Sequence, residues 1–252
     1  MNNALVTGVS SGIGFELAKA LLKRGFNVYG VSRRVPKEII RHVNFHFLSA
    51  DLSNINGLSD ILVDFFINKH KALDKIMYVF LNAGEFNKRL APVIDVPLSE
   101  YVSLMNINVW SNKVIIDFLL RSNISINTVI FSSSISSLRA RKGMGSYAIS
   151  KAALNMMAKL YSLEHPEIFF SVLGLCNVNT FIADNILQLP LLGNFDELRE
   201  LRERAKSSDY LVSPYERAEQ ILLLLESDLK IKTTSGDFFE IRHLLNGVVE
   251  EA

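Results

Sequence analysis

Short apolar runs alternate with longer amphipathic stretches along most of the chain. The short runs carry Val, Ile, Phe and Leu without strict alternation of apolar and polar residues, which is typical of strands buried on both faces of a sheet. They predict strands at Ala4–Thr7, Asn27–Ser32, Asn44–Ser49, Ile76–Leu81, Thr128–Ser132 and Phe169–Leu175.

The stretches between these runs have helical periodicity, and they predict helices at about 13–24, 53–70, 99–121, 147–164 and 213–226. Arg24-Gly25 is a stop signal for the first helix. Ser213-Pro214 supplies an N-cap and a first-turn residue for the last helix. The alternation predicts an α/β fold, in which helices cover both faces of a parallel sheet.

One segment, at about 181–212, interrupts the alternation. It is helical only in patches, Asp184–Leu189 and Phe195–Ala205, and it follows the carboxyl end of the sixth strand. Ligands of such sheets bind at the carboxyl ends of the strands, so we predict a substrate lid here, with an ordinary pair of surface helices as the alternative. The 252 residues fit one large domain, and we expect a single domain over 1–252.

Composition narrows the possible partners and sites. Hydrophobic residues make up 49% of the chain, and 27 basic residues nearly balance 26 acidic ones. The balance gives no indication of a nucleic-acid or membrane-surface partner. The single cysteine, Cys176, excludes an internal disulfide and a zinc cluster of the usual spacing, so no metal is expected. The N-terminus does not have the pattern of a signal peptide, and the expectation is a cytoplasmic protein.

Tyr147 and Lys151 are the most informative pair of residues. They lie four positions apart, so on a helix both side chains share one face. A free tyrosine has a pKa near ~10, and a neighbouring lysine cation lowers that pKa by favouring the phenolate. The pair therefore predicts a general acid/base for interconversion of a carbonyl and an alcohol.

A glycine-rich loop joins the first strand to the first helix. Glycines permit a tight turn, close approach of backbone to a pyrophosphate and packing of helix on strand, while the helix N-terminus attracts phosphate. A glycine-rich turn without a ligand is the alternative. The loop predicts a dinucleotide site that contains Thr7, Gly8, Ser10, Ser11, Gly12, Ile13 and Gly14.

The second strand ends in Ser32-Arg33-Arg34, about twenty residues beyond this loop. An acidic residue at this point would bind the ribose 2′-hydroxyl of NAD, whereas an arginine pairs with the 2′-phosphate of NADP. The arginines therefore predict NADP(H) as the cofactor, unless both are solvated turn residues.

The loop spacing, the Tyr147/Lys151 pair and Leu81-Asn82-Ala83-Gly84 together resemble the short-chain dehydrogenase/reductase family over nearly the whole chain. The resemblance implies a Rossmann-like doubly wound sheet. It implies that Asn82 supports the central sheet, that Ala83-Gly84 lets backbone pass beside the cofactor, and that Asp51-Leu52 lies on the adenine side. It also implies that Tyr147 and Lys151 contact the nicotinamide half of the cofactor.

The family's catalytic serine matches Ser134, which lies thirteen residues before the tyrosine. A hydroxyl there can stabilise developing negative charge on a carbonyl oxygen. Ser133 is the alternative. The family's helix asparagine matches Asn108, which the resemblance implies anchors a water-linked proton path to the lysine. Asn106 is the alternative for this role.

The segment after the sixth strand departs from the family's P-G-x-V-x-T pattern. Val178 and Thr180 keep the positions that contact the carboxamide of the nicotinamide, but Leu175 and Cys176 replace the proline and the glycine. The replacement leaves the local backbone geometry open. Cys176 is expected to be a small buried residue, or alternatively an accessible thiol near the ring.

The resemblance implies an NADPH-dependent carbonyl reductase in which Tyr147 protonates the substrate oxygen. Alternatives are an NADP-dependent secondary-alcohol dehydrogenase, a 3-oxoacyl thioester reductase and a non-catalytic NADP(H)-binding regulator. The stretches Leu211–Pro214 and Ser235–Arg242 look like the sepiapterin/benzil reductase branch, which implies a vicinal dicarbonyl or α-hydroxyketone substrate.

Two further features concern partners. Arg139, Arg141 and Lys142 cluster between Ser134 and Tyr147 and indicate either a solvated basic loop or an anionic or polar substrate. The family also implies a homodimer or homotetramer, formed by the helices at about 99–121 and 147–164. Apolar residues there face either a partner or the chain's own sheet: Ile115, Ile116, Leu119, Leu120, Leu154, Met157 and Leu160.

Overall fold

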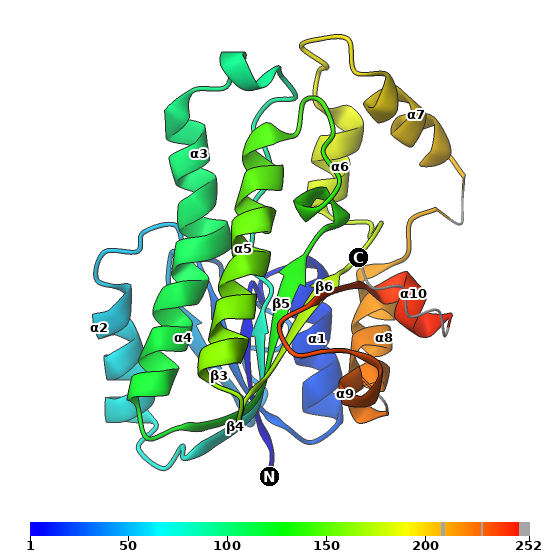
Figure 1. Ribbon diagram of the computed structural model, residues 1–252. Helices are drawn as coiled ribbons and strands as arrows, with labels where there is room; N and C mark the ends of the chain where they lie inside the picture. Colours follow the sequence, from blue (N-terminus) through cyan, green and yellow to red (C-terminus); the bar gives the residue numbers. More distant parts are fainter. Residues whose placement is uncertain (208–209, 228, 247–252) are drawn as a thin grey trace.

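A seven-stranded parallel sheet forms the centre of the computed structural model, which describes residues 1–207, 210–227 and 229–246 (Figure 1). The strand order is β3-β2-β1-β4-β5-β6-β7, so the direction of chain progression reverses between β1 and β4. This is the doubly wound, Rossmann-like arrangement that the sequence predicts, and ligands bind at such a reversal point. The strands are β1 Asn3–Thr7, β2 Asn27–Ser32, β3 Phe45–Ser49, β4 Lys75–Leu81, β5 Ser125–Ser133, β6 Phe169–Gly174 and β7 Phe238–Glu240.

All six predicted strands are present; β2 has the predicted bounds, and the bounds of the other strands differ by one to three residues. The prediction for β6 is wrong at its end, because the strand stops at Gly174 and Leu175 lies beyond it. The seventh strand was not predicted. It has only three residues, Phe238–Glu240, and pairs in parallel with β6, with Phe238 beside Val172. Such a short run carries no periodicity that the sequence alone could show.

Helices cover both faces of the sheet, as predicted. On one face pack α2 Leu58–Leu62 and α4 Ser111–Arg121, together with α5 Gly145–Glu164. On the other face pack α1 Gly12–Lys23 and α8 Pro214–Glu226. Neighbouring residues of each strand serve opposite faces. In β1, Leu5 belongs to the first core, whereas Ala4 and Val6 belong to the second.

Two of the predicted helices differ from the structure. The helix expected over 53–70 begins only at Leu58, after Gly57 with φ +77°, and continues as a π-helix, η1 Val63–Lys69. The helix expected over 99–121 consists of α3 Leu98–Met105 and α4, joined by a π-helical turn, η3 Asn106–Trp110. π-Helical turns are frequent at functional sites.

Other helix ends follow their predicted signals. The chain turns after α1 at Gly25, which has φ +76°. The Ser213 hydroxyl accepts a hydrogen bond from the Glu216 N–H at 3.1 Å and caps α8. Short elements complete the fold: η2 Val93–Asp95, η4 Ile135–Ser137, α9 Leu229–Lys232 and α10 Ile241–Leu245.

The segment predicted as a lid contains two helices, α6 Phe181–Gln188 and α7 Asp196–Arg204. Both extend beyond the carboxyl ends of the strands, at the top of the view in Figure 1. Residues 208–209 of this segment, and residues 247–252 of the predicted domain, lie outside the described residues. A small apolar cluster that includes Phe195, Leu198 and Met144 packs α7 against the start of α5.

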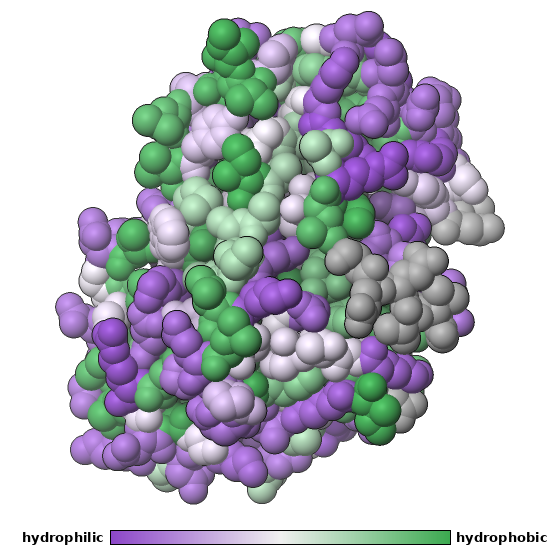
Figure 2. All heavy atoms as spheres, in the orientation of Figure 1, coloured by the Kyte–Doolittle hydropathy of each residue, from purple (hydrophilic) through white to green (hydrophobic). Residues whose placement is uncertain are grey.

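Most of the apolar residues considered for an oligomer interface face the chain's own sheet. Ile115, Ile116 and Leu119, for example, are fully buried in the core. Leu160 is 51% exposed, however, and Met156 and Leu163 of the same helix are 58% and 73% exposed. Figure 2 shows hydrophobic side chains over α3 and α5 and mainly hydrophilic ones over α7. Within the described part of the chain, no helix is long and apolar enough to span a membrane.

Candidate active site

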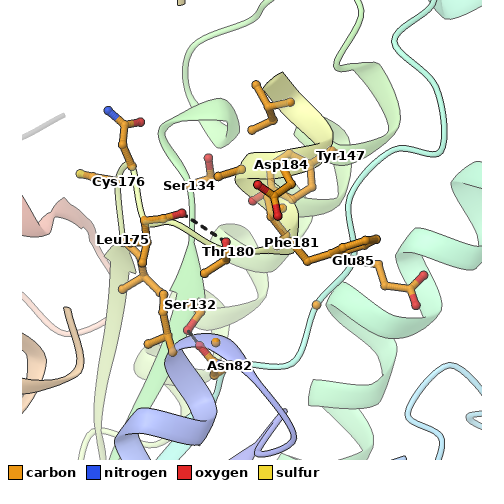
Figure 3. A pocket seen from close by; sticks show the side chains of 18 of the residues that line it. Asn82, Glu85, Ser132, Ser134, Tyr147, Leu175, Cys176, Thr180, Phe181 and Asp184 are labelled. Atoms are coloured by element: carbon orange, nitrogen blue, oxygen red, sulfur yellow. Dashed lines mark hydrogen bonds between the residues drawn. The ribbon is translucent and has the colours of Figure 1, made fainter. Parts of the chain in front are cut away.

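A cavity of about 1160 Å³ opens at the carboxyl ends of the central strands. Its walls come from the β1–α1 loop, the ends of β4 and β5, the start of α5 and the helices α6 and α7, as Figure 3 shows in part. Most of the predicted site residues line it: Gly8, Ser10, Ser11, Gly12, Ile13, Ser32, Arg33, Arg34, Leu52, Asn82, Ala83, Gly84, Ser134, Tyr147, Lys151, Val178 and Thr180. Thr7, Gly14, Asp51 and Asn108 are not part of the lining.

The glycines of the β1–α1 loop bring backbone segments closer together than a side chain would allow. Gly8 has φ +78°, and a Cβ there would lie 3.1 Å from the Ala83 Cα. A Cβ on Gly14 would lie only 2.5 Å from the Gly8 carbonyl oxygen. This crowding explains why the two positions need glycine. At Gly8, which lines the cavity, it also leaves bare backbone facing that space, as a dinucleotide pyrophosphate requires.

The N-terminus of α1 supplies donors for the same ligand. Ser11 is the N-cap residue, and its side chain makes no capping hydrogen bond. The first N–H groups of a helix lack partners within the helix, and the helix dipole adds partial positive charge. Ser11, Gly12 and Ile13 all line the cavity, so these donors suit a phosphate group.

Thr7, beneath the cavity, and Asn82, in its wall, connect the ends of the central strands. The Thr7 hydroxyl accepts hydrogen bonds from the N–H groups of Asn82 and Ala83, both at 2.9 Å. The Asn82 side chain in turn accepts a hydrogen bond from the Ser132 hydroxyl at 3.1 Å. These contacts join the ends of β1, β4 and β5 and hold the floor of the site in place.

The two arginines after β2 line the cavity near the glycine-rich loop. Arg34 approaches the glycine-rich loop, with a 3.5 Å contact to the Ser11 hydroxyl. Arg33 contacts Glu85 at 3.3 Å and Asp51 at 4.0 Å, and its side chain is 56% exposed. Although desolvation opposes it, hydrogen bonds from Ser53 and the Arg33 charge give Asp51 a lowered pKa.

Tyr147, Ser134 and Lys151 meet at the centre of the cavity wall. Tyr147 is buried in the first turns of α5, where its ring packs 4.8 Å from that of Phe86, centroid to centroid. The Lys151 ammonium lies 5.7 Å from the centre of the Tyr147 ring and donates a hydrogen bond to the Ser132 carbonyl at 2.8 Å. One helix face therefore presents both groups, as the i,i+4 spacing predicts.

The predicted direction of the Tyr147 pKa is wrong for this structure. Burial raises the pKa of Tyr147 to about 12, and a hydrogen bond with Ser134 opposes the rise only in part. Burial also lowers the pKa of Lys151 to about 8. The Lys151 cation is directed at the Ser132 carbonyl, so desolvation dominates over its effect on the phenol.

The structure distinguishes between the two candidate serines. Ser134 forms the hydrogen bond with Tyr147, whereas the Ser133 hydroxyl donates to the Asn155 side chain at 2.6 Å. Both serines line the cavity, but only Ser134 is joined to the phenol. This geometry favours Ser134 as the partner of Tyr147.

The two candidate asparagines also differ. Asn108 is fully buried within the π-helical turn, and its side chain accepts a hydrogen bond from the Glu85 N–H at 2.9 Å and donates to the Ser150 hydroxyl at 2.9 Å. A Cβ on Gly84 would lie 3.0 Å from the Asn108 side-chain oxygen and 3.6 Å from the Lys151 ammonium. Asn108 thus joins the β4 end to α5 close to the lysine, whereas Asn106 is only partly buried.

Cys176 adopts the conformation that glycine favours. Its φ is +59°, the only positive value among non-glycine residues in the described chain. The replacement of the family's glycine therefore keeps the left-handed backbone, at an expected strain of about 1–2 kcal/mol. The thiol is partly exposed, and burial is the main cause of its raised pKa. Beyond it, Val178 and Thr180 still line the cavity.

Several residues with a role in the site's geometry were missed at the sequence level. The buried Asn87 donates to the Gly143 carbonyl at 3.2 Å and accepts from the Tyr147 N–H at 3.0 Å, so it fixes the start of α5. No motif surrounds this asparagine. Other missed residues also line the cavity. Glu85 follows β4, and the rest lie in or after α6 and α7: Phe181, Asp184, Arg204 and Tyr210.

Comparisons with known proteins agree with this geometry. The family model described as short chain dehydrogenase matches residues 2–188. An uncharacterized oxidoreductase of Schizosaccharomyces pombe is 26% identical over 252 residues, which cover 94% of each chain. A benzil reductase of Bacillus cereus, described as forming (S)-benzoin, is 23% identical over 243 residues, which cover 90% of this chain and 95% of the relative.

A solved structure has the same fold. The crystal structure of a short chain dehydrogenase family protein from Francisella tularensis aligns with a TM-score of 0.77 and 23% identity. The alignment covers 96% of this chain and 97% of the other.

Proposed function

The chain belongs to the short-chain dehydrogenase family of oxidoreductases, and from that premise we propose that it is an NADPH-dependent reductase of carbonyl compounds. The observation that carries the proposal is the meeting of Tyr147, Ser134 and Lys151 on the wall of the cavity that the glycine-rich loop also lines. A proton donor, an oxyanion-stabilising hydroxyl and a dinucleotide cradle thus share one space.

The residues at the β1–α1 loop fit a nicotinamide dinucleotide, because bare backbone and helix N–H groups face the cavity there. When bound, such a cofactor supplies the hydride that reduces the carbonyl carbon. The contact of Arg34 with the loop, and the position of Arg33 beside it, support NADP(H) over NAD(H). In this proposal Val178 and Thr180 contact the carboxamide of the nicotinamide.

Tyr147 donates the proton that completes the alcohol. With a pKa of about 12, its phenol stays protonated at neutral pH and is ready to donate to an oxygen that gains negative charge. The Ser134 hydroxyl, already hydrogen bonded to the phenol, donates to the same oxygen. Lys151 has a pKa of about 8 and is mostly protonated at pH 7. Lys151 stabilises the phenolate of Tyr147 that remains after the proton is donated, and it binds the ribose hydroxyls of the cofactor. Asn108 positions the path along which Tyr147 is reprotonated.

The substrate end supports reduction of an aryl or alkyl dicarbonyl. The cavity there is partly apolar, with Met144, Ile182 and Ile186 in its wall, and the lid helix α6 covers it. Because the benzil reductase relative has a name that describes dicarbonyl reduction, vicinal diketones are the first compounds to test.

The test is a panel of vicinal diketones, aldehydes, 3-oxoacyl thioesters and secondary alcohols, offered with NADPH or NADP⁺ and followed at the nicotinamide absorbance. We expect turnover of ketones or dicarbonyls with NADPH, and a Michaelis constant for NADPH at least ~10-fold below that for NADH. Preference for NADH would contradict the cofactor assignment. Absence of turnover across the panel, with NADPH bound, would favour a binding protein instead.

We further propose that two or four copies associate through α3, α4 and α5. The exposed apolar side chains of Met156, Leu160 and Leu163 form one side of α5 that the chain itself does not cover. Sedimentation equilibrium with a Leu160→Glu variant tests this, and an unchanged mass of the variant assembly would contradict it.

A further inference from the structure

We propose that the substrate of this enzyme carries an anionic group, a carboxylate or a phosphate, that binds to Arg139, Arg141 and Arg204 while its carbonyl lies at Tyr147. This inference rests on the proposed function, because it concerns the substrate end of the same cavity. All three arginines line that cavity, and they come from two different elements of the fold.

The fold brings the three arginines to the wall of one cavity. Arg139 and Arg141 lie in the loop between η4 and α5, and Arg204 is the last residue of the lid helix α7. The loop and the lid are packed firmly, since a Cβ on Gly143 would lie 2.9 Å from the Phe195 ring. Arg139 and Arg204 lie close enough to Arg141 for their charges to act on it.

Pairing separates these three arginines from Arg33 and Arg242, which also line the cavity; Arg34 has no salt bridge among the described residues but lies beside the glycine-rich loop. Arg242 is neutralised by Glu240 at 2.7 Å, and Arg33 contacts Glu85 at 3.3 Å. Across residues 1–207, 210–227 and 229–246, no carboxylate forms a salt bridge with any member of the arginine trio.

The positive charges of the three arginines also repel one another. Burial is the main cause that lowers the pKa of Arg141, and the charges of Arg139 and Arg204 lower it further. Glu197 on α7 counteracts this effect without reaching salt-bridge distance. An arginine keeps its charge in any case, so the partly buried Arg141 is held near two exposed groups of like charge, Arg139 and Arg204. An oxyanion with several acceptor atoms relieves this repulsion and matches the forked donors of arginine.

The anionic group has to lie away from the reacting carbonyl. Asp184 of α6 lines the same cavity as Tyr147, and its carboxylate repels a negative charge close to the centre of the site (Figure 3). The arginine trio belongs to the loop and to the end of α7 instead. We therefore expect the enzyme's preference among substrates to depend on the spacing between the carbonyl and the anionic group of the substrate.

The experiment uses pairs of substrates that differ only in charge. Linear methyl-ketone carboxylates of increasing chain length are compared with their methyl esters, and phosphate monoesters of hydroxyketones are compared with the free hydroxyketones. The measured quantity is the ratio of kcat/KM for the anion to that for its neutral partner. The carboxylate and phosphate arms show which oxyanion the trio prefers.

The variants are Arg141→Gln, the more exposed Arg139→Gln and Arg141→Lys. Lys142→Gln is the matched control, because Lys142 is an exposed cation next in sequence that does not line the cavity. We expect Arg141→Gln to reduce the ratio about 10- to 100-fold, the range for one charge-assisted hydrogen bond. Arg141→Lys reduces it less, and Lys142→Gln leaves it as in the wild type.

Calorimetric titration of the NADP⁺-loaded protein with the same acids and esters gives a second measurement that needs no turnover. Tighter binding of the acids, lost in Arg141→Gln and Arg139→Gln, supports the proposal. A ratio near one in the wild type, or a ratio that neither variant changes, overturns it. A panel that is bound but never reduced contradicts the proposed reductase instead, so the two failures are distinguishable.

Discussion

The cofactor end and the substrate end of the cavity are built in different ways. The cofactor end is built around backbone, where Gly8 and Gly14 allow segments to approach closely and the N-terminus of α1 offers its N–H groups. The substrate end is built from side chains, contributed by the loop before α5 and by α6 and α7. The glycine-rich loop is contiguous in sequence and is joined by Ala83 and by the side chains of Arg33 and Arg34, whereas the substrate end gathers residues from about 139 to 210.

This difference determines how each end tolerates change. A backbone cradle depends on residues that have no side chain, so any added atom disturbs it. A side-chain surface can change its charge and shape one residue at a time without affecting the sheet, as is common for loops on a rigid scaffold. The fold thus allows one cofactor to serve different substrates.

The largest expected effect lies where the two ends meet. Tyr147→Phe keeps the ring that packs on Phe86 but removes the proton donor. We expect turnover to fall by about 10²–10⁴-fold, whereas NADPH affinity stays unchanged. Tyr210→Phe, which removes a hydroxyl from the same cavity, is the control and should retain turnover. Stopped-flow absorbance and fluorescence titration measure the two quantities, and near-normal turnover of the Phe variant would refute the assignment.

The cofactor end is tested by Gly8→Ala, with Gly57→Ala as its match. The two glycines have φ values of +78° and +77°, but only Gly8 has backbone within 4 Å of an added Cβ. Both variants should lose about 1–2 kcal/mol of unfolding free energy through backbone strain. Gly8→Ala should also bind NADPH about 100-fold more weakly, because the loop is displaced. Equal NADPH affinity in the two variants would show that crowding at Gly8 is unimportant.

Lys151 makes stability depend on pH in the cofactor-free protein. Its pKa is about 8 when folded and 10.5 when free, so between these values the unfolded chain binds more protons. The free energy of unfolding therefore rises with pH across that window, by up to about 3 kcal/mol from this group. Lys151→Met should remove this contribution, whereas Lys142→Met should preserve it. Urea denaturation at pH 7.5 and 10.5 measures the change in unfolding free energy. An equal pH dependence of that free energy in the Lys151→Met and Lys142→Met variants would contradict the assignment of the effect to Lys151.

The smallest expected effect concerns Cys176, between the two ends. Cys176→Gly and Cys176→Ala both remove the thiol, but only glycine relaxes a φ of +59°. The glycine variant should be more stable than the alanine variant by about 0.5–1 kcal/mol, since relief of strain exceeds the extra chain entropy. Chemical denaturation compares them, and a more stable alanine variant would mean that the backbone is not strained.

The cofactor end was predictable from the sequence because its signals are local. The glycine spacing, the arginines after β2 and the Tyr147/Lys151 spacing each lie within a few residues. The arginines of the substrate end were only partly recognised, since Arg204 lies far from Arg141 in sequence and comes near enough to affect its charge only through the fold of α7. The pKa of Tyr147 was predicted in the wrong direction because burial, the dominant cause, is a property of the packed cavity. Strand β7 and Asn87 carry no pattern at all.

The wide turn Asn106–Trp110 has a consequence for how this scaffold can vary. A π-helical turn closes its hydrogen bonds over five residues where an α-helix uses four, so it holds one extra residue between α3 and α4. Asn108 lies within this turn, and Ile115, Ile116 and Leu119 of α4 lie in the core beyond it. Because an α-helix advances about 100° per residue, we expect that an added α-helical residue between the turn and α4 would rotate these three side chains away from the sheet. Deletion of one residue from the turn should instead convert it to regular α-helix and leave the direction of α4 unchanged.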